Sequence, residues 1–378
     1  MKMKLKLVAL SALFATGAMA QSSVTIYGVV DAGVASVKNT GTGRVTGLIT
    51  GGNTVSRLGF RGVEDLGGGL AASFVLEGAL NNDVGGGATQ TTGLDFQRRS
   101  TVSLSNAFGE LRLGRDFLAH YHSNYLFDVT ANRGLAQIEV FSLGRAGVST
   151  ANGFRTGNSV SYFLPATLGG VYGQLQYAFS EVNSRRDAIT GPDGLSTSAA
   201  NAATDKTGSY MGGRLGYLGR GVNVAVSYAQ WSDAVRTVGA SSYADDYKIA
   251  NLGASYDFGF IKPMAFVQNE KMGGQGAIQK FEFNTYSVGA TAPVGAGLIR
   301  VQASRYDQKS STADASKFSA EYIYNLSVRT SIYTEVARIS NQGSGAYSLL
   351  GGVGGLSSAA PTGGGKSTGF AVGLKHTF

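Results

Sequence analysis

The stretch TVSRLGFRGVEDLGGGLAASFVLEG, residues 54–78, predicts a two-stranded hairpin with a tight, glycine-rich turn. Arg57 and Arg61 alternate with Leu58 and Phe60, and the alternation continues beyond the turn. Because successive side chains of a strand point to opposite faces, each strand has one apolar and one polar face. A soluble sheet can show the same pattern, but two arginines on the polar face, beside a glycine, favour a wall that faces confined water.

A closed membrane barrel accounts for such a wall. Only helices and closed barrels satisfy their backbone polar groups inside a bilayer. A barrel strand places lipid-facing apolar residues between lumen-facing polar ones, and no apolar run after residue 20 is long enough for a membrane helix. We therefore expect a transmembrane β-barrel pore.

The composition agrees with an all-β chain. The 378 residues include 56 glycines and only 5 prolines, together with 18 tyrosines and 19 phenylalanines. There is no cysteine, which excludes disulfides and thiolate chemistry. The net charge of +8 is modest and scattered, so no nucleic-acid partner is predicted.

The first twenty residues, MKMKLKLVALSALFATGAMA, are typical of a secretory signal peptide. Three lysines precede a short apolar core, and Ala18-Met19-Ala20 forms a cleavage site. A membrane anchor would need a longer apolar span. We expect cleavage before Gln21 and a mature domain of residues 21–378, in which loss of three lysines lowers the net charge from +8 to +5.

The rest of the chain predicts a 16-stranded antiparallel barrel, wide enough for an aqueous channel. Apolar alternation recurs in segments separated by short and long connections in turn, as expected for short periplasmic turns and long outer loops. A Gly/Thr-rich segment at 37–53 reads as the first long loop. The longest interior connection, residues 116–153, is a candidate functional loop.

Five stretches together resemble the Gram-negative general porin family, of the β-proteobacterial type. They span the mature chain in the family's order: SSVTIYGVVDAGV at 22–34, SRLGFRGVEDLGGGLAASFVLE at 56–77, FGELRLGR at 108–115, RTGNSVSY at 155–162 and GLKHTF at 373–378. The resemblance implies a trimer of 16-stranded barrels, in which the third loop folds into the lumen and constricts it, opposite a cluster of wall arginines.

The resemblance also assigns residues to that constriction. Arg57 matches the wall arginine, with Arg61 further along the same face, and Arg98 and Arg155 match two further arginines. Residues 116–153 correspond to the third loop.

The acids of the third loop and the end of the chain complete this assignment. The loop lacks the PEFG-like segment of enteric porins, so Asp128 and Glu139 are candidate lumen acids by position alone. The terminal Phe378 resembles the aromatic signal that the barrel-assembly machinery reads.

Other motifs do not predict a catalytic, cofactor or metal site. APTGGGKS at 360–367 nearly matches a phosphate-binding loop, but an alternating segment follows it where a helix is required. His120 and His122 would share a face of an extended segment, yet no carboxylate or cysteine completes a ligand set. The three histidines of the chain belong to no recognisable catalytic arrangement.

We therefore expect a passive general diffusion porin of the outer membrane. The expected partners are two other copies of the chain, membrane lipid, the assembly machinery, and the small ions and hydrophilic solutes that cross. The arginine wall and the net charge favour anions. Two alternatives stay open: a barrel enzyme that acts on lipid or peptide, and an adhesin whose outer loops bind surfaces.

Overall fold

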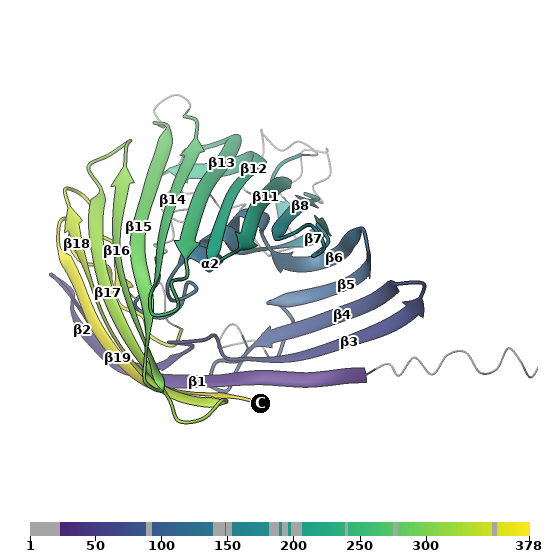
Figure 1. Cartoon of the computed structure of the whole chain (residues 1–378). Helices are drawn as coiled ribbons and strands as arrows, with labels where there is room; N and C mark the ends of the chain where they lie inside the picture. The colour runs from purple at the N-terminus through teal and green to yellow at the C-terminus, as the bar shows by residue number, and fades with distance from the viewer. Residues whose placement is uncertain are drawn as a thin grey trace, which may run out of the picture.

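The computed structural model describes a closed antiparallel barrel, in which the strands form a ring around one helix, α2 (Figure 1). The described residues are 23–87, 93–138, 148, 153–180, 189–190, 196–197, 206–238, 241–274, 279–349 and 354–378. Within them, no helix has the length and apolar character needed to cross a bilayer.

The elements of the described residues are, in chain order, β1 (Ser23–Asn39), β2 (Gly43–Thr50), β3 (Arg57–Gly67), β4 (Leu70–Ala79), β5 (Arg99–Asn106), β6 (Gly109–Phe117), α2 (Ala119–Phe127), β7 (Arg155–Phe163), β8 (Val171–Ala178), β9 (Ile189–Thr190), β10 (Ser196–Thr197), β11 (Tyr210–Gly219), β12 (Val222–Val238), β13 (Ser241–Tyr256), β14 (Lys262–Met272), β15 (Phe281–Val294), β16 (Gly297–Gln308), β17 (Asp314–Asn325), β18 (Thr330–Gln342) and β19 (Lys366–Thr377). Strands β9 and β10 form a small separate sheet.

The large sheet has seventeen strands but sixteen positions around the ring, because β2 and β3 share one. Strand β2 pairs with Ala32–Asn39 of β1, and β3 pairs with Ser23–Val29 of the same strand. Strand pairing is interrupted between β2 and β3, because the buried Asp31 carboxylate accepts the backbone N–H groups of Asn53 and Thr54, at 3.0 and 2.6 Å. The 16-stranded antiparallel barrel predicted from the sequence is confirmed.

One predicted loop is instead part of the sheet. Residues 37–53 read as a long loop, but β1 continues to Asn39 and β2 begins at Gly43, so only a tight turn separates them. The alternating GRVTGLIT of β2 pairs along β1 despite its high content of glycine and threonine. Composition was a poor guide here, because the pairing partner decides whether such a segment forms a strand.

The two ends of the barrel differ as predicted. At the end that holds both termini of the barrel, connections are short, such as the two glycines between β3 and β4. The other end carries long connections, including 80–98, 118–154 and 343–365. Three connections at that end are short as well, at 40–42, 239–240 and 309–313.

The last strand shows how the two faces of the wall differ. Phe370, Val372 and Leu374 are each about half exposed on the outer face, at 50%, 53% and 50%. The residues between them face inward and are small; a Cβ on Gly373 would lie 2.3 Å from the ring of Tyr333. The terminal alternation expected from the sequence is confirmed, with apolar groups toward lipid.

Phe378, the last residue, contributes the final pair of hydrogen bonds that joins the last strand to the first. Its N–H donates to the carbonyl of Gly28, and the N–H of Gly28 donates to the carbonyl of Phe378, both at 3.1 Å. Its ring also covers Gly28, where a Cβ would lie 2.3 Å from it.

Deleting Phe378 is expected to lower the amount of folded protein in the outer membrane, because both closing hydrogen bonds and the terminal aromatic are lost. Band shift on unheated gels of outer-membrane fractions measures this. Phe370→Ala is the matched control, since it removes an outward aromatic of the same strand without opening the ring, and it should assemble normally. Normal assembly of the truncated chain would contradict the expectation.

Candidate constriction site

The third connection at the outer end joins β6 to β7; of this third loop the structure describes residues 118–138, 148 and 153–154, which begin with α2 inside the barrel (Figure 1). This helix packs against β8 and β11–β14. The N–H of Ala119 donates to Oε1 of Gln176 at 2.9 Å, and Nδ2 of Asn251 donates to the carbonyl of His120 at 3.2 Å. The ring of Phe127 fills the space over Gly253, where a Cβ would lie only 2.0 Å from it.

Residues 136–138 attach the far part of this connection to β16–β18. The hydroxyls of Tyr306 and Ser319 donate to the carbonyls of Ile138 and Ala136, at 2.5 and 3.0 Å. The N–H of Ala136 donates to Oε2 of Glu335 at 3.2 Å. These contacts hold the chain against the inner wall, and the inward-folded third loop is confirmed.

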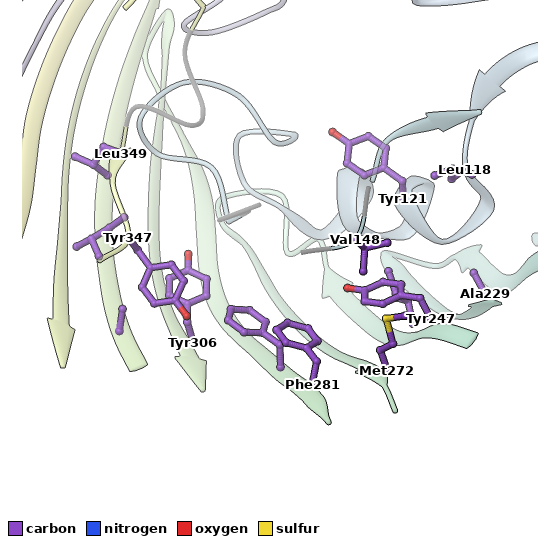
Figure 2. Close-up of a cluster of buried hydrophobic side chains, with 14 of the residues drawn as sticks. Leu118, Tyr121, Val148, Ala229, Tyr247, Met272, Phe281, Tyr306, Tyr347 and Leu349 are labelled. Atoms are coloured by element: carbon purple, nitrogen blue, oxygen red, sulfur yellow. The ribbon is translucent and has the colours of Figure 1, made fainter. Parts of the chain in front are cut away.

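Apolar side chains cover the inner wall where the third loop lies against it. Figure 2 shows Tyr247 of β13, Phe281 of β15 and Tyr306 of β16 in a row across the wall, next to Tyr347 of the connection that follows β18, with Tyr121 of the third loop in the same cluster. Tyr247 and Phe281 stack with ring centroids 6.4 Å apart, and Tyr306 and Tyr347 stack at 6.0 Å. This buried layer fixes the loop by packing as well as by hydrogen bonds.

The loop boundaries differ slightly from those expected. Strand β6 continues through Phe117, so Asp116 belongs to the wall, and β7 begins at Arg155. The Asp116 carboxylate binds Nη1 of Arg112 at 2.6 Å and lies 3.6 Å from Nε of Arg99. Sequence analysis placed Asp116 in the loop and missed this ion-pair network.

The Asp128 side chain is 4% exposed, and its hydrogen bonds are to other residues of the third loop. Its carboxylate accepts the N–H of Thr130 at 2.8 Å and the N–H of Ile138 at 2.6 Å. Burial raises the pKa of Asp128 above its usual range. These contacts join the two ends of the segment 128–138, which favours a structural role. The other candidate acid, Glu139, lies outside the described residues.

Of the two histidines of α2, His120 is fully buried and His122 is partly buried. Burial lowers the pKa of His120 and of His122 to about 3, so both are neutral at physiological pH and add no charge to the lumen. The His120 ring packs edge-on against Trp231 at 5.4 Å. Within the part of the chain that the structure describes, no group of three or more His, Cys, Asp or Glu residues is placed to hold a metal ion.

Glu77 brings two of the expected arginines together. Nε of Arg98 donates to its Oε1 at 2.7 Å, and Nε of Arg57 lies 3.4 Å from its Oε2. The hydroxyl of Tyr27 donates to Oε2 at 3.1 Å. Tyr27, Gly59 and Glu77 are in register across β1, β3 and β4, and a Cβ on Gly59 would lie 2.4 Å from the Tyr27 ring. Only glycine lets Tyr27 cross β3 to reach Glu77.

The other two expected arginines, Arg155 and Arg61, also lie near this group. Arg155 places its guanidinium 4.0 Å from the centre of the Phe117 ring and lies within electrostatic range of Arg98 and Glu77. Arg61 is exposed and lies 5.4 Å from the centre of the Tyr27 ring. Sequence analysis named these arginines but gave Glu77 no role; its position in register with Gly59 was the available signal.

The P-loop-like segment does not have the structure that phosphate binding requires. Lys366 is exposed and is the first residue of β19, so a strand follows the glycines. A phosphate-binding loop of this kind needs a helix there.

A model of the family described as Gram-negative porin matches residues 7–344. The chain is 37% identical to outer membrane porin protein 32 of Delftia acidovorans over 384 residues, with all of both chains covered. It is 31% identical to an outer membrane porin protein of Bordetella pertussis over 421 residues, again with all of both chains covered.

Solved structures agree with these relatives. The anion-selective porin from Comamonas acidovorans superimposes with a TM-score of 0.79 at 34% identity, covering 94% of this chain and 100% of that one. OmpT of Vibrio cholerae, solved in a trimer form, shares the fold with a TM-score of 0.62 at 13% identity. The closed barrel, the loop inside it and these full-length matches lead to one conclusion: the chain belongs to the Gram-negative porin family, and it is a diffusion channel of the outer membrane rather than an enzyme.

Proposed function

We propose that this porin prefers anions, and that Arg57, Arg98 and Arg155, with Arg61 beside them, form a lumen cluster opposite the third loop. The observation that carries the proposal is the single carboxylate between the arginines: Arg57 and Arg98 both contact Glu77. These two arginines and one glutamate leave a net charge of +1, to which Arg155 lies close, and arginine stays protonated at any physiological pH.

The third loop makes this charge effective. At physiological salt the Debye length is about 8 Å, so charges on the wall of a wide channel are largely screened. A loop held against β8, β11–β14 and β16–β18 narrows the water-filled space beside the arginines, and low-dielectric walls focus their field on a passing ion. The anion selectivity named for the Comamonas acidovorans porin supports the same preference here.

Transport is passive in this proposal, with no cofactor and no covalent step. Small ions and hydrophilic solutes pass down their gradients. The third loop limits the size of the solutes that can pass, and the arginines favour anions over cations. Planar-bilayer recording of the purified chain tests the proposal: stepwise conductance increases are expected. A chain that inserts but conducts nothing would refute it.

Three further proposals concern export and assembly. Residues 1–20, which lie outside the described residues, are a cleaved signal peptide, and three copies of the mature chain form the working unit. The trimer form of OmpT, a protein of the same fold, supports the second. We also propose that the assembly machinery reads Phe378. N-terminal sequencing should begin at Gln21 and native mass should give a trimer; a retained Met1 or a monomer would overturn the respective proposal.

A further inference from the structure

The third loop makes a tight turn at residues 131–134. Ala131, Asn132 and Gly134 have φ of 54°, 53° and 66°, in the left-handed region. Residues other than glycine rarely adopt this region, because Cβ then approaches a backbone carbonyl oxygen. Two such residues in succession persist only where other contacts hold the backbone in place.

Contacts on both sides hold this turn. On the side of α2, Nδ2 of Asn132 donates to Oδ1 of Asn124. On the side of the wall, a Cβ on Gly134 would lie 2.3 Å from the carbonyl oxygen of Gly52 and 2.4 Å from Oε2 of Glu335. The turn is therefore fixed between the helix and the wall, and it has little room to move.

Arg133 is the residue that the turn leaves open to the lumen. Of residues 132–138, it alone is not buried. Its Nη1 donates to the carbonyl of Asn132 at 2.6 Å, and its guanidinium lies 5.9 Å from the centre of the Tyr125 ring of α2. Among the described residues, no carboxylate forms an ion pair with Arg133. The side chain is thus oriented by its own loop, and its positive charge has no negative partner.

Two arginines of the constriction are close to this charge. Arg133 lies within electrostatic range of Arg98, which precedes β5, and of Arg155, the first residue of β7. Like charges repel, so packing alone would not favour an arginine at this position. The other acidic or basic residue of 118–138 that carries a charge is Asp128, which is buried. This part of the loop therefore offers the lumen a cation and no acid.

We propose that Arg133 is a selectivity-determining residue of the constriction, and that it supplies positive charge from the third loop while Arg98 and Arg155 supply it from the wall. An anion that passes between loop and wall is attracted from both sides, and a cation is repelled from both sides. This role depends on the anion preference proposed above, and it adds a residue of the loop to the arginines of the wall.

A single thiol tests the charge at this position in the folded channel. The chain has no cysteine, so R133C introduces the only one. Reversal potentials are measured in planar bilayers under a potassium chloride gradient, before and after addition of a cationic or an anionic methanethiosulfonate reagent. R133C should lower the preference for chloride over potassium roughly fivefold, because one charge at ~5 Å from the ion is lost. The cationic reagent should restore the preference, and the anionic reagent should lower it further.

Two further variants separate charge from packing. R133K keeps the charge but loses the planar guanidinium, so it should stay within about twofold of wild-type selectivity, which a packing role on Tyr125 would not allow. R329C is the matched control, because Arg329 is exposed in the turn between β17 and β18, far along the chain from the third loop. Neither reagent should change the selectivity of R329C.

Unchanged selectivity in R133C, or a loss that the cationic reagent does not restore, would overturn the assignment of Arg133. A thiol that neither reagent modifies, as measured by the mass of the recovered protein, would overturn it too, because small ions reach any residue on their path. A wild-type channel without preference for anions would instead overturn the proposed function on which this role depends.

Discussion

Replacing Arg57, Arg98 and Arg155 together by alanine is expected to lower the preference for chloride over potassium roughly a hundredfold. A unit charge ~5 Å from an ion contributes ~0.8 kcal/mol in a water-like dielectric, and screening at ~0.1 M salt leaves ~0.5 kcal/mol. Three such charges change the free energy of chloride in the constriction by ~1.5 kcal/mol and that of potassium by the same amount in the opposite direction, so the difference between the two ions changes by ~3 kcal/mol. Since 1.36 kcal/mol corresponds to a factor of ten, the reversal potential in a salt gradient should shift clearly toward potassium.

Two comparisons separate the local field from net charge. R220A/R305A/R329A removes three arginines from the strand ends and turns, and it should leave selectivity unchanged. Glu77→Gln removes the carboxylate between Arg57 and Arg98 and should shift selectivity the other way, toward chloride. The shift in the triple arginine variant should shrink as salt is raised. If the triple arginine variant kept wild-type selectivity at low salt, these arginines would not determine selectivity, although the barrel fold would be unaffected by that result.

Replacing Gly253 by valine is expected to narrow the pore. A Cβ there would lie 2.0 Å from the Phe127 ring, whereas ordinary contact begins at 3.4 Å, so the ring must move by about 1.4 Å. The sheet is the stiffer element and valine suits a strand, so α2 should move away from the wall and into the lumen. Overpacking of this kind costs about 1–3 kcal/mol.

Single-channel conductance measures this effect, and a clear drop is expected with anion preference retained. Gly157→Val is the matched control, because a Cβ at that strand position meets its nearest atom at 3.9 Å. Its conductance should stay close to that of wild type. If Gly253→Val conducted as well as wild type, the position of α2 would not limit the pore.

The alternation of polar and apolar residues was enough to predict the barrel. Arg57 and Leu58 already indicated two faces, and the same period in the last strand matched the observed exposure of Phe370 and Leu374. Lumen-facing residues of a barrel strand are expected to be polar. The inner wall covered by buried side chains departs from this expectation, because Phe281 and Phe283 face inward and are 1% exposed. Nothing local to β15 reveals that a distant segment covers it.

The candidate site was predicted less completely, because it depends on contacts between distant segments. Glu77 meets Arg98 only because the chain bends before β5 and brings the guanidinium back to β4. Asp128 looks like a free loop acid in the sequence, yet it binds the backbone of Thr130 and Ile138. The spacing of residues in the sequence identifies neither the contact of Glu77 with Arg98 nor that of Asp128 with Ile138.

The reversal potential of the wild-type channel in a tenfold potassium chloride gradient tests the central claim most directly. Gly59, Tyr27 and Glu77 hold two arginines in place on the wall, and the docked third loop narrows the lumen. The account therefore predicts a potential of the sign that chloride preference gives, growing as total salt is lowered. A potential of zero, or one of the opposite sign, would contradict it.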